Sequence, residues 1–250
     1  MGRSDGPLSE AGEASLDQLG KRLSDWEFDA VISSSLSRAR RTAASFADQV
    51  DIDDDFIEID LGRWEGMAFA DVQEKHGEEL QEAVTTRTIP MGGTGESFDQ
   101  VGKRAISAVD RLFEKMGDNE KVAVVTHGGF LQAVLQRHLA GHDRRVHAFT
   151  ANTGITRIVH QFGRPRLATF NDTGHLGPQS ALVEGHLAAG NKVVALIRHG
   201  QTKANVERRW QGRGDWDLDE TGMRQAEALG EWYGRHATVY TSPLKRAAST

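Results

Sequence analysis

The stretch KVVALIRHGQTKAN, residues 192–205, joins a short apolar run to an Arg-His-Gly turn. Its apolar part, Val193–Ile197, predicts a strand that is buried on both faces of a parallel sheet. A second run, VAVVTHGG at residues 122–129, has the same form. Because ligands of open α/β sheets lie beyond the carboxyl ends of the strands, we expect His199 and His127 to converge on one sheet edge.

Helical patterns alternate with these strands. The first pattern places Leu16, Leu19 and Leu23 on one face behind Ser9, which is a candidate N-cap. Residues 28–35 predict a third strand. Helical spacing covers three further stretches, residues 35–50, 98–116 and 129–141. We therefore expect an α/β fold with a mostly parallel sheet that is flanked by helices on both faces.

The chain repeats part of itself. Residues 2–23 and 212–233 align without a gap, with 8 of 22 positions identical. A second match pairs residues 31–42 with residues 239–250. A fixed order of matches indicates an internal repeat. Two explanations stay open at this point: a tandem array of one domain type with both copies cut, or a circular permutant with a duplicated segment.

The repeat predicts the domain organisation. We expect residues 1–176 to form a body that lacks its first strand, and residues 177–191 to form a linker. Residues 192–250 would then be the N-terminal part of a second copy. Since an empty strand position leaves two unpaired edges, we expect residues 192–211 to dock into the first copy and supply its central strand. A domain-swapped homodimer is the alternative form of the same docking.

Composition excludes several classes of function. The chain has 250 residues, of which 38% are hydrophobic, and a formal net charge of −6, which argues against nucleic acid as a partner. It contains no cysteine, so disulfides, thiolate metal sites and cysteine nucleophiles are excluded. No apolar run approaches the length of about 20 residues that a membrane helix needs. We expect a cytoplasmic protein without a metal site, since the histidines show no ligand spacing.

The residues at the expected sheet edge suit a phosphate. Arg198 directly precedes His199, and Arg38 lies at a helix start after a serine-rich turn. Arginine offers a planar fork of donors to phosphate oxygens, and a neutral imidazole is a competent nucleophile. Gly128, after His127, lets backbone N–H groups approach a ligand closely. These features predict a pocket for a small phosphorylated molecule.

Five segments carry a resemblance to a known family: LIRHGQTKAN, QGRGDWDLDETG, SSSLSRARRT, EIDLGRWEG and VVTHGG. In this order and context they resemble the histidine phosphatase superfamily, in its phosphoglycerate mutase-like branch. The resemblance implies that His199 becomes a phosphohistidine and that Arg198, Arg38 and His127 hold the phosphoryl oxygens. It further implies a phosphate contact from Asn205 and an acid–base role for Glu58, with no metal or other cofactor.

Several alternatives remain open in the sequence. Asp60 and Glu65 are rival acids to Glu58, and Arg246, the repeat counterpart of Arg38, can serve the pocket instead. The leading function is a phosphatase that hydrolyses small phosphomonoesters. A phosphoglycerate mutase is the alternative enzyme, although its family members carry a longer excursion than the one between Glu58 and His127. A non-catalytic phosphate-binding remnant is the alternative outside the enzymes.

Overall fold

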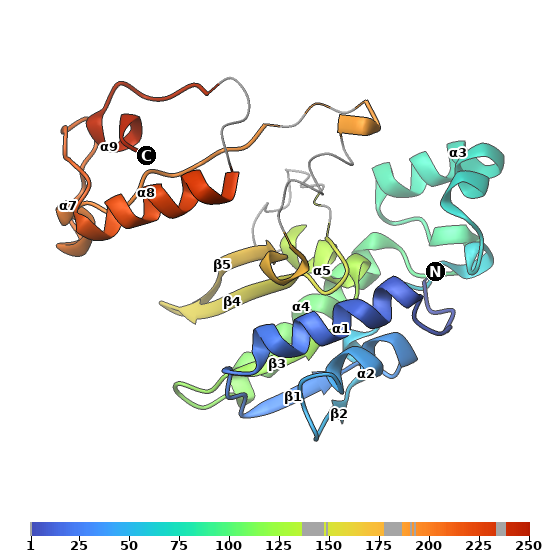
Figure 1. The fold of residues 1–250 in the computed structure, drawn as a ribbon. Coiled ribbons are helices and arrows are strands. Elements are labelled where there is room, and N and C mark those ends of the chain that lie inside the picture. The colour runs from blue at the N-terminus through green and yellow to red at the C-terminus, as the bar shows by residue number, and fades with distance from the viewer. Residues whose placement is uncertain are drawn as a thin grey trace. The chain divides into compact units, whose positions relative to one another are not determined.

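The computed structural model describes residues 2–136, 148, 150–177, 187–190, 192, 194–233 and 239–250. The chain divides into two compact units, Met1–Leu176 and Gly177–Thr250, here called unit 1 and unit 2. Figure 1 shows the ribbon of both. Each unit is described by itself below.

Unit 1 contains a three-stranded parallel sheet. Strand β1 (Ala30–Ser33) lies in its middle, between β2 (Asp51–Ile52) and β3 (Val122–Val125). A separate antiparallel pair consists of β4 (Ile155–Gln161) and β5 (Arg164–Asp172). The sheet confirms the strands predicted at 28–35 and 122–125 and their parallel direction.

The helices of unit 1 begin near the positions expected from the sequence. Helix α1 (Glu10–Leu23) starts behind Ser9, whose side chain accepts a hydrogen bond from the Gly12 N–H. The others are α2 (Ser37–Ala43), α4 (Phe98–Lys115) and α5 (Gly128–Leu135), besides α3 described below. Part of the helix predicted at 129–141 lies outside the described residues.

Helix α2 is shorter than the predicted stretch of residues 35–50, which is a correction. It ends at Ala43, and residues 44–46 form turns. The Ser45 hydroxyl donates to the Thr42 carbonyl at 2.8 Å, and the Thr42 hydroxyl donates to the Arg38 carbonyl at 2.8 Å. Hydroxyls that bond the preceding turn compete with the regular helix ladder, and the helical pattern alone does not reveal this.

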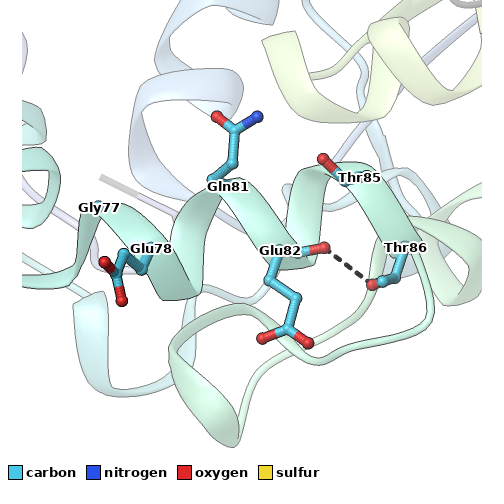
Figure 2. A pocket seen from close by; sticks show the side chains of 6 residues that line it. All are labelled: Gly77, Glu78, Gln81, Glu82, Thr85 and Thr86. Carbon is cyan, nitrogen blue, oxygen red and sulfur yellow. Dashed lines mark hydrogen bonds between the residues drawn. The ribbon is translucent and has the colours of Figure 1, made fainter.

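Between the first two strands and α4 the chain makes short 3-10 turns and one long helix. The turns are η1 (Asp54–Phe56), η2 (Gly62–Trp64) and η3 (Met91–Gly93), and a fourth, η5 (Gly174–Leu176), follows β5. Helix α3 (Phe69–Thr86) carries an open hollow on its outer side. Figure 2 shows the six residues that line this hollow, from Gly77 to Thr86.

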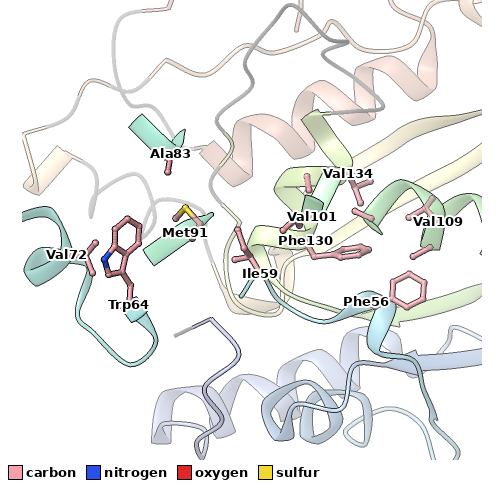
Figure 3. Packing of buried hydrophobic residues seen from close by; sticks show 13 residues of the cluster. Phe56, Ile59, Trp64, Val72, Ala83, Met91, Val101, Val109, Phe130 and Val134 are labelled. Carbon is pink, nitrogen blue, oxygen red and sulfur yellow. The ribbon is translucent and has the colours of Figure 1, made fainter. Parts of the chain in front are cut away.

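The apolar core of unit 1 gathers around the loop that follows η1. Figure 3 shows Ile59 between two groups of buried side chains, one around Trp64 and Met91 and the other around Phe130. Phe56 and Phe130 are in tilted ring contact with centroids 5.5 Å apart. The loop residues next to Ile59 are therefore anchored from both sides by packing.

Every strand of unit 1 except β1 has one edge without a partner strand in the part of the chain that the structure describes. Among the described residues, β3 pairs only with β1, and β4 pairs only with β5. All four residues of β3, VAVV, are only partly buried although all are apolar. An apolar strand with one open edge has room for a further strand beside it.

The described part of unit 2 does not show the strand expected at Val193–Ile197. Residues 194–199 form no strand, and Val194 and Leu196 are 81% and 94% exposed. A strand is stable only beside a partner ladder, and the described part of unit 2 holds none. The apolar pattern shows that the segment suits a sheet, but it does not show where that sheet is. The predicted central position of this segment in a sheet is therefore not confirmed.

The repeated segments correspond in their helices, whereas β1 has no strand counterpart in residues 239–241. Helix α1 has its counterpart in α8 (Glu220–Tyr233), and α2 in α9 (Lys245–Ala248); α7 (Lys203–Val206) precedes α8. Equivalent arginines make equivalent bonds: Arg38 donates to the carbonyls of Gly2 and Ser4 at 2.6 and 2.9 Å, and Arg246 to those of Gly212 and Gly214 at 2.9 and 2.7 Å. The sequence match therefore corresponds to a match in contacts.

Gly62 and Gly66 offer a matched test of how tightly the loops of unit 1 pack. Both have a positive φ, of 56° and 73°. A Cβ at Gly62 would lie 2.5 Å from the Gly95 nitrogen and 2.7 Å from the Met91 carbonyl, whereas one at Gly66 would meet nothing within 4 Å.

We expect Gly62→Ala to lower the free energy of unfolding by about 1–3 kcal/mol more than Gly66→Ala, because both share the left-handed backbone cost and only the first adds overlap with backbone atoms. Urea unfolding followed by circular dichroism measures the difference. Equal losses in the two variants would show that the loops can move apart.

Candidate active site

The candidate site of unit 1 lies at the carboxyl ends of β1 and β3. Ser34 follows β1, and His127 follows β3 by two residues. The Thr126 hydroxyl donates to the Phe56 carbonyl at 2.6 Å and so ties the end of β3 to the loop that carries Glu58. Parallel pairing brings these three chain segments to one sheet edge, as expected.

His127 is the buried centre of this site. Its side chain lies at the N-cap of α5, the residue is 7% exposed, and Nε2 lies 2.7 Å from the Ser34 hydroxyl oxygen. Burial lowers its pKa from 6.5 to about 4, with further lowering by the positive charges of Arg38 and Arg104, against a small opposing effect of Asp5. The imidazole is therefore neutral at neutral pH and has one N–H to donate.

Glu58 is held at the start of α5. Its carboxylate accepts hydrogen bonds from the backbone N–H groups of Gly129 and Phe130 at 3.1 and 3.2 Å. It also accepts from the N–H of Ile59 at 2.9 Å. The free N–H groups and the dipole at a helix N-terminus favour a negative group there. Glu58 and His127 thus meet at the same helix terminus.

The glycine pair after His127 has a clear steric role at its second position. A Cβ at Gly129 would lie 2.5 Å from a Glu58 carboxylate oxygen. One at Gly128 would meet only the Thr150 hydroxyl, at 3.3 Å. The close approach at this glycine pair therefore occurs at Gly129 and involves Glu58. The approach of a phosphate to Gly128, which we expect from the sequence, stays a prediction.

Arg38 reaches the same region. Its guanidinium bonds the carbonyls of Gly2 and Ser4, and its charge acts on His127. The structure therefore brings together Arg38, Glu58 and His127, three of the residues chosen from the sequence.

The two rival acids are engaged elsewhere. Glu65 accepts hydrogen bonds from the backbone of Arg3, Ser4 and Leu61 and from the Ser4 hydroxyl. Burial raises the pKa of Glu65, but these hydrogen bonds outweigh it and lower the pKa below its ordinary value. Asp60 accepts from the Gly62 N–H at 2.8 Å and lies 3.8 Å from the Arg3 guanidinium. Both carboxylates serve the local structure of the loop.

Sequence reasoning missed two residues beside Glu58, namely Arg3 and Arg104. Arg3 and Arg104 both bond the Glu96 carboxylate and the Glu58 carbonyl. One feature could have revealed Arg104 in advance. This residue lies on α4 beside the buried face of Val101 and Ala105, where a charged side chain needs a partner. No local pattern connects Arg3 with Glu96.

The remaining predicted residues belong to unit 2. Arg198 is exposed, and His199 is partly buried, with Nδ1 2.7 Å from the Gly200 carbonyl. Asn205 forms a capping box with Thr202 at the start of α7, and Arg246 is 7% exposed. Their roles beside His127 stay predictions.

Three further observations concern the hollow on α3, metal binding and membrane spanning. The hollow on α3 in Figure 2 is lined by none of the candidate residues. Within the described ranges, no group of three or more histidine or acidic side chains could hold a metal ion. Nor does any described helix have the length and apolar character needed to cross a membrane.

The lowered pKa of His127 predicts a pH dependence of stability. Between pH 6.5 and about 4 the unfolded chain binds a proton on this imidazole and the folded chain does not, so the free energy of unfolding falls as the pH falls through this window. The loss from this residue is at most about 3 kcal/mol.

Urea unfolding at several pH values, compared between the natural chain and His127→Gln, isolates this contribution, because carboxylates act equally in both. An imidazole resonance that titrates near 6.5 would contradict the burial argument.

Comparisons with known proteins agree with the site. The family description "Histidine phosphatase superfamily (branch 1)" matches residues 1–173 and 194–250. Phosphoserine phosphatase 1 of Hydrogenobacter thermophilus is 29% identical over 193 residues, covering 75% of this chain and 90% of the relative. A relative in Erwinia tasmaniensis with the name "Probable phosphoglycerate mutase" is 30% identical over 192 residues, covering 70% and 86%.

A solved structure supports the fold. The phosphoserine phosphatase of Entamoeba histolytica, a histidine-to-alanine mutant in complex with phosphoserine, matches with a TM-score of 0.61 at 25% identity, covering 71% of this chain and 90% of that one. The chain also matches mycobacterial proteins at 33% identity over 154 residues, and this match spans only 42% of their length. With its sheet edge, its buried histidine and these matches, the chain belongs to the histidine phosphatase superfamily.

Proposed function

We propose that the chain hydrolyses small phosphomonoesters through a phosphohistidine formed on His199. The observation that carries this proposal is the grouping of His127, Glu58 and Arg38 at one sheet edge, with His127 neutral at neutral pH. Membership of the family and the phosphatase names of its relatives support it.

The proposed reaction has two transfers. A ring nitrogen of His199 attacks phosphorus, the ester P–O bond breaks, and Glu58 gives a proton to the leaving oxygen. Glu58 then takes a proton from water, whose oxygen attacks phosphorus and breaks the P–N bond, releasing inorganic phosphate. Arg198 and Arg38 and the N–H of His127 stabilise the phosphoryl oxygens in both steps.

The proposal needs the nucleophile beside unit 1. We infer that residues 194–199 enter the sheet between β3 and β4, pair in parallel with β3, and place His199 at the same edge as His127. Both strands have an unpaired edge among the described residues, and Val194 and Leu196 are exposed and apolar. Burying these side chains and pairing both edges favours insertion. The completed sheet would be flanked by helices on both faces.

The length of the connection permits insertion. Between His175 and Lys192 lie 16 residues (192 − 175 − 1), which reach up to about 50 Å when extended. A domain of this size is about 35–40 Å across. The same strand could instead come from a second copy of the chain, which gives a domain-swapped homodimer. Formation of that homodimer depends on protein concentration, whereas insertion within one chain does not.

The repeated segments compete for one place, and the contacts favour the first. The Ser35 N–H donates to the Asp54 carboxylate at 2.9 Å, and the repeat counterpart of Ser35 is Pro243, which has no N–H. The Ser4 hydroxyl donates to Glu65 at 2.6 Å, and its counterpart is Gly214. We therefore assign Arg38 rather than Arg246 to the pocket.

The alternative enzyme is a phosphoglycerate mutase, favoured by the name of the Erwinia tasmaniensis relative. A mutase must keep the phosphohistidine from water and return the phosphoryl group to a second hydroxyl. The stretch between Glu58 and His127 that would cover the site is short, so we prefer hydrolysis. The cytoplasmic location that we expect from the sequence stays a prediction.

A first experiment tests the reaction. We expect the chain to release p-nitrophenol from p-nitrophenyl phosphate, and His199→Ala to lower the rate by at least about 1,000-fold, because no other group then accepts the phosphoryl group. His76→Gln, on α3 outside the site, is the control and should keep the activity. Turnover that survives His199→Ala would exclude the phosphohistidine, and a natural chain that binds phosphate without turnover would favour the non-catalytic remnant.

A second experiment tests the inserted strand. Leu196→Asp should abolish activity and lower the melting temperature, because a charge cannot enter the sheet without a partner. Phe162→Asp replaces another exposed apolar side chain, 81% exposed in the β4–β5 turn, and should change neither. Unchanged activity in Leu196→Asp would rule the insertion out. Size-exclusion chromatography at several concentrations separates insertion within one chain from exchange between two.

A further inference from the structure

Arg104 uses all the N–H donors of its guanidinium in hydrogen bonds to Glu96 and to the loop that carries Glu58. It is a side chain of α4 that is 16% exposed. Its Nε and Nη2 donate to the two oxygens of Glu96 at 3.0 and 2.8 Å. Nη1 donates to the carbonyls of Asp55 and Ile57 at 2.9 and 2.8 Å, and Nη2 also donates to the carbonyl of Glu58 at 3.4 Å. A guanidinium has five N–H donors, and all five are used here.

Arg3 reaches the same two partners from the N-terminal segment. Its Nε donates to the Glu58 carbonyl at 3.2 Å, and its Nη2 donates to Glu96 at 2.9 Å. Glu96 therefore bridges two arginines and also accepts the Asp60 N–H at 3.2 Å. Three carbonyls of the loop and one of its N–H groups are fixed by this set.

The charges agree with the geometry. Burial raises the pKa of Glu96, but hydrogen bonding and charge from Arg104 outweigh this and lower the pKa below its ordinary value. Glu96 is thus ionised between the two arginines at neutral pH. The Arg104 guanidinium also lies 5.9 Å from the ring centroid of Phe130, whose backbone N–H bonds the Glu58 carboxylate.

The main chain and the side chain of Glu58 are consequently held by different elements. The two arginines hold its carbonyl, and the first turn of α5 holds its carboxylate. Two anchors on one residue fix the carboxylate in position and direction. General acid catalysis depends on such positioning, since misplacement by about 1 Å costs about 100-fold in rate.

We propose that Arg104, with Glu96 and Arg3, is a positioning network that aims the Glu58 carboxyl group at the leaving oxygen. The inference rests on the proposed hydrolase function. The network bonds the main chain of Glu58 and acts on the reaction through that residue. The positive charge of Arg104 also reaches His127, and Arg104→Lys retains that charge. The effect of the network must therefore depend on how much the leaving group needs a proton.

Two substrates separate this role from a purely structural one. The p-nitrophenolate ion leaves without a proton, whereas the alkoxide of phosphoserine needs one. We expect Arg104→Lys to lower kcat/KM for phosphoserine by about 100-fold and for p-nitrophenyl phosphate by less than about 5-fold. Lysine keeps the charge but cannot make the forked contacts. Glu58→Gln should show the same selective loss.

Arg111→Lys is the matched control on the same helix. Arg111 pairs with Asp53 and Asp55 at 3.0 and 2.6 Å and makes none of the contacts to Glu58. Both substrates should keep their kcat/KM in this variant. Arg3→Lys, at a side chain that is 36% exposed, is the second test variant if Arg104→Lys does not fold, and it should show the same selective loss in weaker form.

The outcomes are distinct. An equal loss on both substrates in a folded Arg104→Lys or Arg3→Lys variant would overturn the positioning role and leave the hydrolase proposal standing. A natural chain that turns over neither substrate would overturn the hydrolase proposal and this inference with it. A selective loss for phosphoserine in the test variants, with no loss in Arg111→Lys, is the result that supports the network.

Discussion

The open edge of β3 is the constraint on which the rest of the molecule depends. Backbone N–H and C=O groups that are withdrawn from water need partners, and β3 has them on one side only within the described part of unit 1. The residues that follow β3 lead directly to His127 and α5. The backbone hydrogen bonds would fix the register of any strand that pairs in parallel with this edge, and so would align the end of that strand with the site. In the proposed assembly, completion of the sheet and completion of the site are therefore one event.

Unit 1 places positive charge beside His127. Arg38 and Arg104 both act on His127, and burial keeps that imidazole neutral. The Glu96 carboxylate accepts hydrogen bonds from both Arg3 and Arg104, and the Glu58 carboxylate is bound to the N-terminus of α5. An anion placed at this edge would therefore meet positive charge and one neutral N–H donor. A dianionic phosphoryl group suits this arrangement, whereas a second cation does not.

Local patterns in the sequence predicted strands and helix caps correctly where the cause of the structure is itself local. Ser9 caps α1 because its partner lies three residues away, and β1 and β3 follow from apolar runs beside turn residues. Arg3 and Arg104 escaped prediction because their contacts join distant parts of the chain: Arg3 lies 93 residues from Glu96, and Arg104 lies 46 residues from Glu58. The strand expected at Val193–Ile197 shows the opposite limit, because its apolar pattern suits a sheet and the described part of unit 2 offers it no partner strand.

The repeat adds a last constraint on the proposed assembly. The second segment retains the side chains that the site would use: Ser242, Arg213 and Arg246 correspond to Ser34, Arg3 and Arg38. It lacks the anchors that fasten the first segment, since Pro243 and Gly214 replace Ser35 and Ser4. An exchange of one segment for the other would therefore leave the chemistry nearly unchanged and weaken only the attachment. In the proposed assembly either segment could complete the site, and the difference in anchoring free energy, not a difference in catalytic groups, would decide which one occupies it.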